Sequence, residues 1–272
     1  MDLTGDRARS LVVLKLGGSL LTRKREVEKL RPKVLTRLAE EVVTAAGVPL
    51  VLLHGAGSFG HPGAARFGLA RAPVPGSTSA ERTRGAAIVA AEVRRLHLAV
   101  LRDLIRAGAS PWSVPLSGVG HNRAGALAGL EVAPFQRALD RGLLPVSFGD
   151  VVPDDVWGVS ILSADTAATE LARRLKARRV VFATDVQGVL EGPLNGKRTV
   201  VEEVTEGLVA RLRPGPGATD VTGGIRAKLE AMLAVARDGA DAGLISGLTD
   251  GAVSRAIRGE MVYGSWAHAR AP

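Results

Sequence analysis

Two short apolar runs near the start of the chain each lead directly into glycine. The first is residues 11–16 (LVVLKL), followed by GGS, and the second is residues 50–53 (LVLL), followed by HGAGSFGHPG. Neither run alternates with polar residues, which is typical of strands that are buried on both faces of a parallel sheet. A glycine-rich turn after such a strand lets backbone N–H groups approach an anion. The pattern therefore predicts two buried strands, each followed by an anion-binding loop.

The rest of the chain alternates between helical and strand-like patterns. Apolar spacing predicts helices over residues 26–46, 80–107, 135–141, from 163 or 165 to about 176, and after Gly224. Apolar runs predict further strands over residues 143–148, 179–183, 242–245 and 261–263. Residues 111–129 suit a hairpin or flap, and residues 197–216 suit a hairpin with a short helix. The alternation predicts an α/β fold, a three-layer αβα sandwich with a mostly parallel central sheet.

Ligands of such folds collect at the carboxyl ends of the strands. The groups expected at this edge are Lys15 with residues 16–19, the 54–61 loop, Gly149–Asp150, Asp165, Asp185 and Gly223–Gly224. Lys15 sits inside a buried strand, which is costly unless its ammonium group meets an anion. Asp165 lies at a helix start, where an acidic side chain also has a simple capping explanation. We therefore expect several anion-binding groups to converge at one edge of the sheet.

The composition narrows the classes of partner. The chain has 272 residues, 46% of them hydrophobic, a formal net charge of +9 and no cysteine, which excludes disulfides and thiolate chemistry. Its arginines are scattered along helices, and one tyrosine with three tryptophans offers little base stacking, so no nucleic-acid partner is expected. No stretch is apolar enough to span a bilayer, and the first residues do not follow the signal-peptide pattern. We expect a cytoplasmic protein that does not bind membranes.

Residues 55–60 (GAGSFG) form a literal G-x-G-x-x-G after a strand, which alone would indicate a dinucleotide-binding unit. That unit requires an acidic residue at the end of the next strand, whereas here a loop and a long helix follow. An NAD-binding oxidoreductase therefore remains only an alternative. The Walker pattern is absent, and His54 and His61 lack the spacing of a zinc pair. Glycine loops with lysines and aspartates at one sheet edge favour phosphoryl transfer.

Six segments occur in the order seen in the amino-acid kinase superfamily: KLGGSLLTRK, HGAGSFGHP, GLLPVSFGD, LSAD, ATDVQGVL and DVTGGIRAK. The HGAGSFGHP loop, in which a histidine follows the glycines, most resembles that of the isopentenyl phosphate kinases. The resemblance implies ATP-dependent phosphorylation of isopentenyl phosphate to isopentenyl diphosphate, in the alternative mevalonate route of isoprenoid biosynthesis. It also implies Mg²⁺ with ATP but no dedicated metal site, and a homodimer. Residues 1–175 would form an acceptor-binding and dimerisation lobe, and residues 176–272 an ATP-binding lobe.

The resemblance also implies roles for individual residues. Ala56 would offer its backbone N–H group to the acceptor and Gly57 to the nucleotide. His61 would hydrogen-bond the acceptor phosphate, Leu162 would contact the acceptor, and Lys24 would stabilise the transferring phosphoryl group. The implied ATP-binding set is Lys15, Gly17, Gly18, Ser19, Gly57, Ala183, Asp185, Gly223 and Lys228. The implied catalytic set is Lys15, Lys24, His61, Asp165 and Lys228, in which Asp165 would orient the lysines.

The chemistry of an alkyl phosphate acceptor is consistent with these residues. Its second pKa is about 6, so it is largely dianionic near neutral pH and needs no strong general base. A histidine donates a hydrogen bond to such a phosphate whether it is neutral or charged. A fosfomycin kinase-like enzyme resembles the same loops and stays an alternative. So does a non-catalytic small-molecule sensor, although a sensor would be expected to lose Lys15, Lys24 and Lys228, which are all present.

Overall fold

The computed structural model describes residues 11–23, 26–74, 79–191, 198–211 and 224–269 of the chain. Its centre is a seven-stranded sheet in the order β13-β12-β9-β1-β2-β6-β3. Neighbouring strands of this sheet run parallel, except that β12 and β13 are antiparallel. The bounds are β1 (Val12–Leu16), β2 (Leu50–His54), β3 (Pro111–Ser113), β6 (Leu144–Phe148), β9 (Arg179–Thr184), β12 (Asp241–Ser246) and β13 (Gly264–Ala267).

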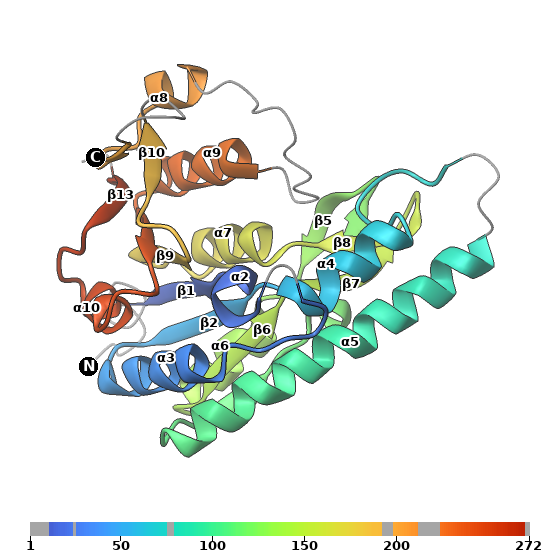
Figure 1. Cartoon of the computed structure of the whole chain (residues 1–272), viewed down its shortest axis with the longest axis horizontal. Helices are drawn as coiled ribbons and strands as arrows, with labels where there is room; N and C mark the ends of the chain where they lie inside the picture. The colour runs from blue at the N-terminus through green and yellow to red at the C-terminus, as the bar shows by residue number, and fades with distance from the viewer. Residues whose placement is uncertain (1–10, 24–25, 75–78, 192–197, 212–223, 270–272) are drawn as a thin grey trace.

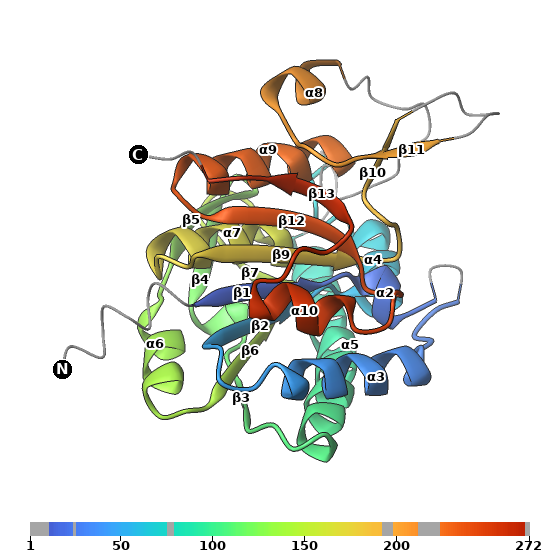
Figure 2. The same ribbon diagram turned by 90° about the vertical axis from the view of Figure 1, so that its left-hand side faces the viewer.

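Helices cover both faces of this sheet. They are α2 (Gly18–Leu21), α3 (Pro32–Thr44), α4 (Gly57–Arg66), α5 (Ser79–Arg106), α6 (Ala133–Asp140), α7 (Ala164–Arg174), α8 (Glu206–Arg211), α9 (Gly224–Arg237) and α10 (Ala252–Arg258). Val12 and Leu14 of β1 pack in a core with α2, α3, α5 and α10, whereas Val13 packs in another with α6, α7 and α9. Figure 2 shows α7 and α9 on one side of the sheet and α3 and α10 on the other. The predicted αβα sandwich is therefore confirmed.

Two smaller sheets flank the central one. A four-stranded sheet has the order β5-β4-β7-β8, and β10 pairs with β11 in an antiparallel hairpin. Their bounds are β4 (Gly120–Arg123), β5 (Ala126–Leu130), β7 (Asp150–Asp154), β8 (Gly158–Leu162), β10 (Val189–Glu191) and β11 (Thr199–Val201). Figure 1 shows the four-stranded sheet beside α4 and α5, and β7 and β8 contact α5. The hairpin predicted within residues 111–129 corresponds to β4 and β5, whereas β7 and β8 were not predicted.

The first predicted helix starts later than the sequence pattern indicated. We predicted a helix over residues 26–46, but α3 begins at Pro32. Proline suits the first helical position, where its missing N–H group costs nothing. Before it, Glu28 has φ 53°, a left-handed conformation that does not occur within a right-handed helix. Residues 26–31 therefore form a loop that leads from α2 into α3.

Two further elements differ from the predictions. The strand predicted over residues 261–263 is absent, and pairing with β12 begins only at Gly264. Met261 and Tyr263 instead expose 71% and 58% of their area to solvent. In addition, α4 was not predicted, because its GSFGHPGAAR sequence is rich in glycine and reads as a loop. Among the described residues, no helix combines the length and apolar character that a membrane span requires.

Candidate active site

Three charged side chains from three elements meet at the carboxyl edge of the sheet. Lys15 is the one charged residue of β1, and its Nζ lies 2.8 Å from Oδ1 of Asp165 in the first turn of α7. Lys228 reaches over from α9, and its Nζ lies 2.7 Å from Oδ2 of the same carboxylate. The three side chains are 10%, 22% and 20% exposed, in the order Lys15, Asp165 and Lys228. The cluster thus carries two ammonium groups and one carboxylate, an excess of positive charge that suits a phosphate.

The capping explanation for Asp165 is not supported, because Ser163 caps the helix. The Ser163 hydroxyl accepts the N–H group of Thr166 at 3.0 Å, and the Asp165 carboxylate faces the two lysines. Burial by itself raises the pKa of the Asp165 carboxyl, but Lys15 and Lys228 outweigh burial and hold that pKa well below its usual range. Asp165 is therefore ionised at neutral pH and holds both ammonium groups in place.

The two glycine loops cross in backbone contact beside this cluster. A Cβ atom on Gly18 would collide with the backbone of Gly57, and a Cβ atom on Gly55 would lie 2.7 Å from the nitrogen of Gly18. Gly57 also has φ 52°, in the left-handed region that favours glycine. Thr22 joins the loops, because its hydroxyl donates to the Gly18 carbonyl at 2.8 Å and accepts the Ser58 N–H group at 2.9 Å. Close approach of two backbones thus explains both glycine motifs.

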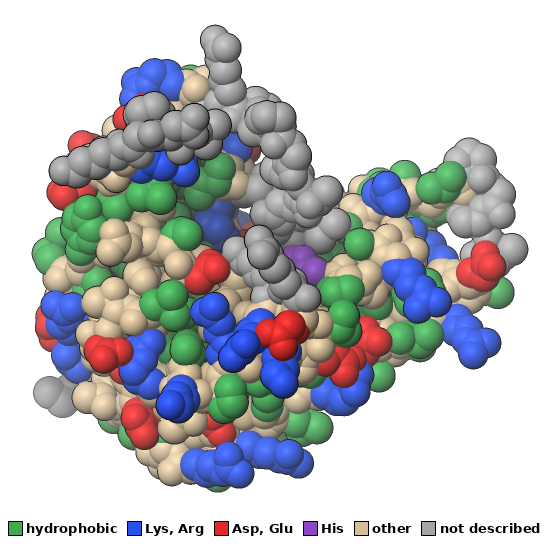
Figure 3. All heavy atoms as spheres, viewed as in Figure 1, with side chains coloured by type: hydrophobic (Ala, Val, Ile, Leu, Met, Phe, Trp, Pro, Cys, Tyr) green, Lys and Arg blue, Asp and Glu red, His purple; other side chains and the backbone are tan. Residues whose placement is uncertain are grey.

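The second glycine loop runs into the N-terminus of α4. Helix N-termini attract anions, because their first N–H groups have no partner within the helix. The N-cap residue Ala56 makes no side-chain hydrogen bond to these groups, and His61 is exposed on the same helix. In the space-filling view, histidine and basic side chains are visible where the surface is hollowed beside α4 (Figure 3). The structure therefore places Ala56, Gly57 and His61 together on one short segment.

The residues predicted to border the nucleotide also lie together, at the ends of β1 and β9. The Ser19 hydroxyl donates to Oδ1 of Asp185 at 2.7 Å, and the N–H group of Gly17 donates to the Ala183 carbonyl at 2.7 Å. Leu162, which was predicted to contact the acceptor, is only 2% exposed and packs in the hydrophobic core, and Ala183 is likewise 1% exposed. Two further predicted residues, Lys24 and Gly223, lie outside the described ranges.

Comparison with known proteins shows which family the chain belongs to. The amino acid kinase family profile matches residues 10–245 of the chain. A curated isopentenyl phosphate kinase from Methanothermobacter thermautotrophicus is 31% identical, over 94% of this chain and 98% of its own length. Another from Haloferax volcanii is 36% identical, over 83% of this chain and 88% of its own length. The chain belongs to the isopentenyl phosphate kinases of the amino acid kinase family. A solved structure described as isopentenyl phosphate kinase superimposes with a TM-score of 0.81 at 28% identity, covering 94% of this chain and 99% of that one.

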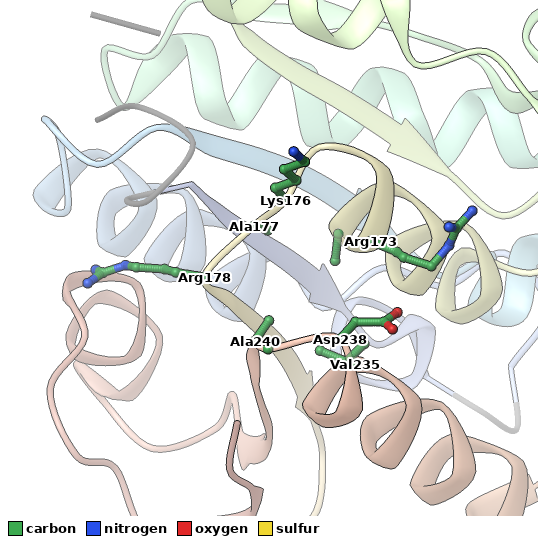
Figure 4. A pocket seen from close by; sticks show the side chains of 9 residues that line it. Arg173, Lys176, Ala177, Arg178, Val235, Asp238 and Ala240 are labelled. Carbon is green, nitrogen blue, oxygen red and sulfur yellow. The ribbon is translucent and has the colours of Figure 1, made fainter. Parts of the chain in front are cut away.

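A separate pocket of this isopentenyl phosphate kinase family member, with a volume of about 520 Å³, lies at the opposite edge of the sheet. It lies between the ends of α7 and α9, where the chain enters β9 and β12. Figure 4 shows that its charged side chains, among them Arg173, Lys176 and Asp238, point in different directions and do not converge. The pocket is therefore distinct from the Lys15–Asp165–Lys228 cluster at the carboxyl edge.

Two further carboxylates of this family member are buried: Asp150, which the sequence placed at the ligand-binding edge, and Asp154, to which the sequence assigned no role. Asp150 is 1% exposed and accepts hydrogen bonds from both terminal nitrogens of Arg94, each at 3.2 Å. Asp154 accepts the Ser160 hydroxyl and four backbone N–H groups. Burial raises the pKa of the Asp154 carboxyl, but these donors outweigh burial and hold that pKa well below its usual range. An aspartate that precedes a turn commonly accepts such N–H groups, and this signal is readable in the sequence.

Replacing Asp165 with asparagine should lower the free energy of unfolding at pH 7 by about 3 kcal/mol, because two partly buried ammonium groups lose their shared counter-charge. The difference from wild type should shrink in acid. The folded pKa of Asp165 is depressed, so its contribution is full above the unfolded pKa of about 4 and declines as the pH falls toward the folded pKa. Urea unfolding at pH 7 and at pH 3 measures both effects. The exposed Asp155→Asn is the matched control, and a difference independent of pH would contradict this account.

Proposed function

We propose that the protein transfers the γ-phosphoryl group of ATP to isopentenyl phosphate, forming isopentenyl diphosphate and ADP. The observation that carries this proposal is the Lys15–Asp165–Lys228 cluster beside two glycine loops in backbone contact. Phosphoryl transfer requires two polyanions to be held in line while developing negative charge is stabilised. The curated isopentenyl phosphate kinases that match almost the whole chain support this acceptor.

The nucleotide side of the site would use the ends of β1, β9 and α9. The backbone of Gly17 and Gly18 would bind ATP phosphates together with the ammonium groups of Lys15 and Lys228. Asp165 fixes these ammonium groups before substrate binds, so that little reorganisation is needed when charge develops in the transition state. Ser19, Ala183 and Asp185 would border the nucleotide, Gly223 would bind its phosphates, and Lys24 would contact the transferring phosphoryl group.

The acceptor side would use the second glycine loop and α4. The N–H group of Ala56 and the His61 side chain would hold the acceptor phosphate, and Gly57 would contact the nucleotide across the crossing. An oxygen of the acceptor phosphate attacks the γ-phosphorus, and the bond from that phosphorus to the bridging oxygen of ADP breaks. The acceptor is a dianion, so no proton has to be removed from it. Positioning and charge stabilisation therefore supply the catalysis.

Mg²⁺ accompanies ATP in phosphoryl transfer, usually bound by nucleotide phosphates and one or two carboxylates. Within the described ranges, no group of three or more histidine, aspartate or glutamate side chains is arranged to hold a metal. Asp185 fits the simpler mode, because it lies at the end of β9 beside the phosphate loop and accepts the Ser19 hydroxyl. We propose that Asp185 helps to hold Mg²⁺, which would neutralise phosphate charge.

The test of this function is an ATP-consumption screen with isopentenyl phosphate, dimethylallyl phosphate, fosfomycin and acetylglutamate. We expect the highest kcat/KM for isopentenyl phosphate, the acceptor named for the curated relatives. Acetylglutamate should be turned over least, because the site offers donors for a dianionic phosphate. Product analysis by mass spectrometry should show isopentenyl diphosphate. Turnover of fosfomycin without turnover of either prenyl phosphate would select the fosfomycin kinase-like alternative. Nucleotide binding without turnover of any acceptor would support the sensor.

His61→Ala should lower kcat/KM for isopentenyl phosphate about 100-fold, because one donor to the phosphate is lost. The fold should stay intact, because His61 is exposed. Steady-state kinetics and circular dichroism of the purified variant measure the two effects. His121→Ala, which removes another exposed histidine on β4, is the matched control and should retain wild-type kinetics. Near-normal turnover by His61→Ala would contradict the acceptor assignment.

We also propose that the protein is a homodimer. Leu98 and Ile105 are 51% and 60% exposed, and their spacing of seven places them on one face of α5. Trp112 on the neighbouring edge strand β3 is 54% exposed. Exposed apolar residues grouped in this way mark interaction sites, and a second copy of the chain would cover them in a symmetric pair. Sedimentation velocity should give a dimer, and Leu98→Glu should give a monomer. A wild-type monomer would contradict this proposal.

A further inference from the structure

Two buried histidines lie beside the second glycine loop (residues 54–61), called the acceptor loop below, and take no part in the proposed chemistry. His54 ends β2, His97 lies in α5, and their side chains are 0% and 4% exposed. His54 Nε2 lies 3.1 Å from His97 Nδ1, and His97 Nε2 lies 2.8 Å from the Ser113 hydroxyl oxygen. On the other side, His54 Nδ1 lies 3.1 Å from the Gly55 carbonyl oxygen. A continuous hydrogen-bonded chain therefore joins β3, α5 and β2 to the loop.

The environment keeps both rings neutral at physiological pH. Burial lowers the pKa of His54 to about 4, and the positive charge of Lys15 adds to this effect. Burial also lowers the pKa of His97 to about 3, with further contributions from His54 and Arg94. Phe148 stacks on the His54 ring, with centroids 5.6 Å apart, and is tilted against the His97 ring, with centroids 4.3 Å apart. It offers no counter-charge to either ring. Neither imidazole therefore carries a charge that could act on a phosphate.

Because both rings are neutral, each has one N–H donor and one acceptor nitrogen, so every hydrogen bond between these groups has a defined donor. A carbonyl oxygen only accepts, so the proton of His54 is on Nδ1 and is donated to Gly55. His54 Nε2 then accepts the Nδ1–H group of His97, and His97 Nε2 accepts the Ser113 hydroxyl. Each ring thus has one tautomer, set by its neighbours.

The end of this chain is a peptide group of the acceptor loop. The peptide that joins Gly55 to Ala56 is planar and trans, so the N–H group of Ala56 points away from the Gly55 carbonyl. Holding the carbonyl inward, over the buried rings, therefore aims the Ala56 N–H group outward. A glycine peptide is otherwise easily rotated, because glycine has few steric limits on its backbone angles.

We propose that His54, His97 and Ser113 form a relay of positioning residues that fixes the Gly55–Ala56 peptide, and with it the N–H group that contacts the acceptor phosphate. This inference rests on the proposed function for the identity of the ligand. The relay itself is defined by hydrogen bonds that exist before any substrate binds. The histidines therefore act through the backbone, and their replacement changes turnover without removing any group that touches substrate.

Three substitutions of His54 separate this role from packing. His54→Asn places an amide N–H group near the position of Nδ1, His54→Gln places one near Nε2, and His54→Phe fills the space without donating. We expect kcat to fall about 10- to 100-fold in His54→Phe and His54→Gln, because the Ala56 N–H group is no longer aimed. His54→Asn should stay within about threefold of wild type, because one donor to Gly55 is kept.

Thermal unfolding of the same variants distinguishes positioning from a purely structural role, in which activity would follow stability. His54→Asn leaves the buried His97 Nδ1–H group without its acceptor, so it should be destabilised while remaining active. The exposed His268→Asn is the control for loss of a histidine and should retain wild-type kinetics. Equal activity of the asparagine and glutamine variants, or wild-type kcat in a folded His54→Phe, would overturn the relay.

Long-range ¹H–¹⁵N spectra of the wild-type histidines test the relay without reference to activity. We expect both rings as Nδ1–H tautomers that stay neutral between about pH 5 and 8. A charged ring or an Nε2–H tautomer of His54 would overturn the relay even in an active kinase. Conversely, an enzyme that shows these tautomers but does not turn over isopentenyl phosphate would contradict the proposed function and retain the relay.

Discussion

The carboxylate of Asp165 between two ammonium groups is the interaction on which the rest of the site depends. β1 lies at the centre of the sheet, where a lysine is tolerated only if its charge meets an opposite one. The carboxylate that meets it comes from α7, and the second lysine comes from α9 across the same face of the sheet. One partly buried ionic cluster therefore joins three elements that are distant in sequence.

Much of the fold was predictable, because buried parallel strands are written as uninterrupted apolar runs that end in glycine. β1, β2, β6 and β12 follow this rule, whereas β9 is an apolar run that ends in Thr184 and Asp185. The helix α5 follows the apolar spacing of a helix. The apolar spacing of a helix did not reveal α4, because Gly60 and Gly63 are poor helix formers. There the helix depends on close packing, in which small residues let α4 approach Val93 and Val89 of α5. Such packing is decided by tertiary contacts and overrides local preference.

The candidate site was predictable to the extent that it uses glycine and lysine beside strand ends. The sequence pattern placed Lys15 and Asp165 at one edge, and the family resemblance added Lys228. The structure brings all three within hydrogen-bond distance. The resemblance also implied that Asp165 orients the lysines, but nothing in the sequence indicated the other pairings. Ser19 and Asp185 are separated by 166 positions, and His54 and His97 by 43. Pairings of this kind follow from strand order and helix placement, which no local pattern encodes. Asp165 shows the same limit, because only the structure identifies Ser163 as the helix cap.

The backbone crossing of the Gly18 and Gly57 loops has a consequence for how such enzymes diversify. Where Gly18 meets Gly57 no side chain lies between the two backbones, so main-chain van der Waals radii set the spacing there. The Thr22 hydroxyl holds the two loops together beside this point. The distance between the two loops at this point is therefore insensitive to substitutions elsewhere in the chain. Substitutions outside the crossing can therefore change which acceptor fits while the spacing of the two loops is kept. A graft that replaces one of the two glycine loops would therefore have to replace the other loop as well.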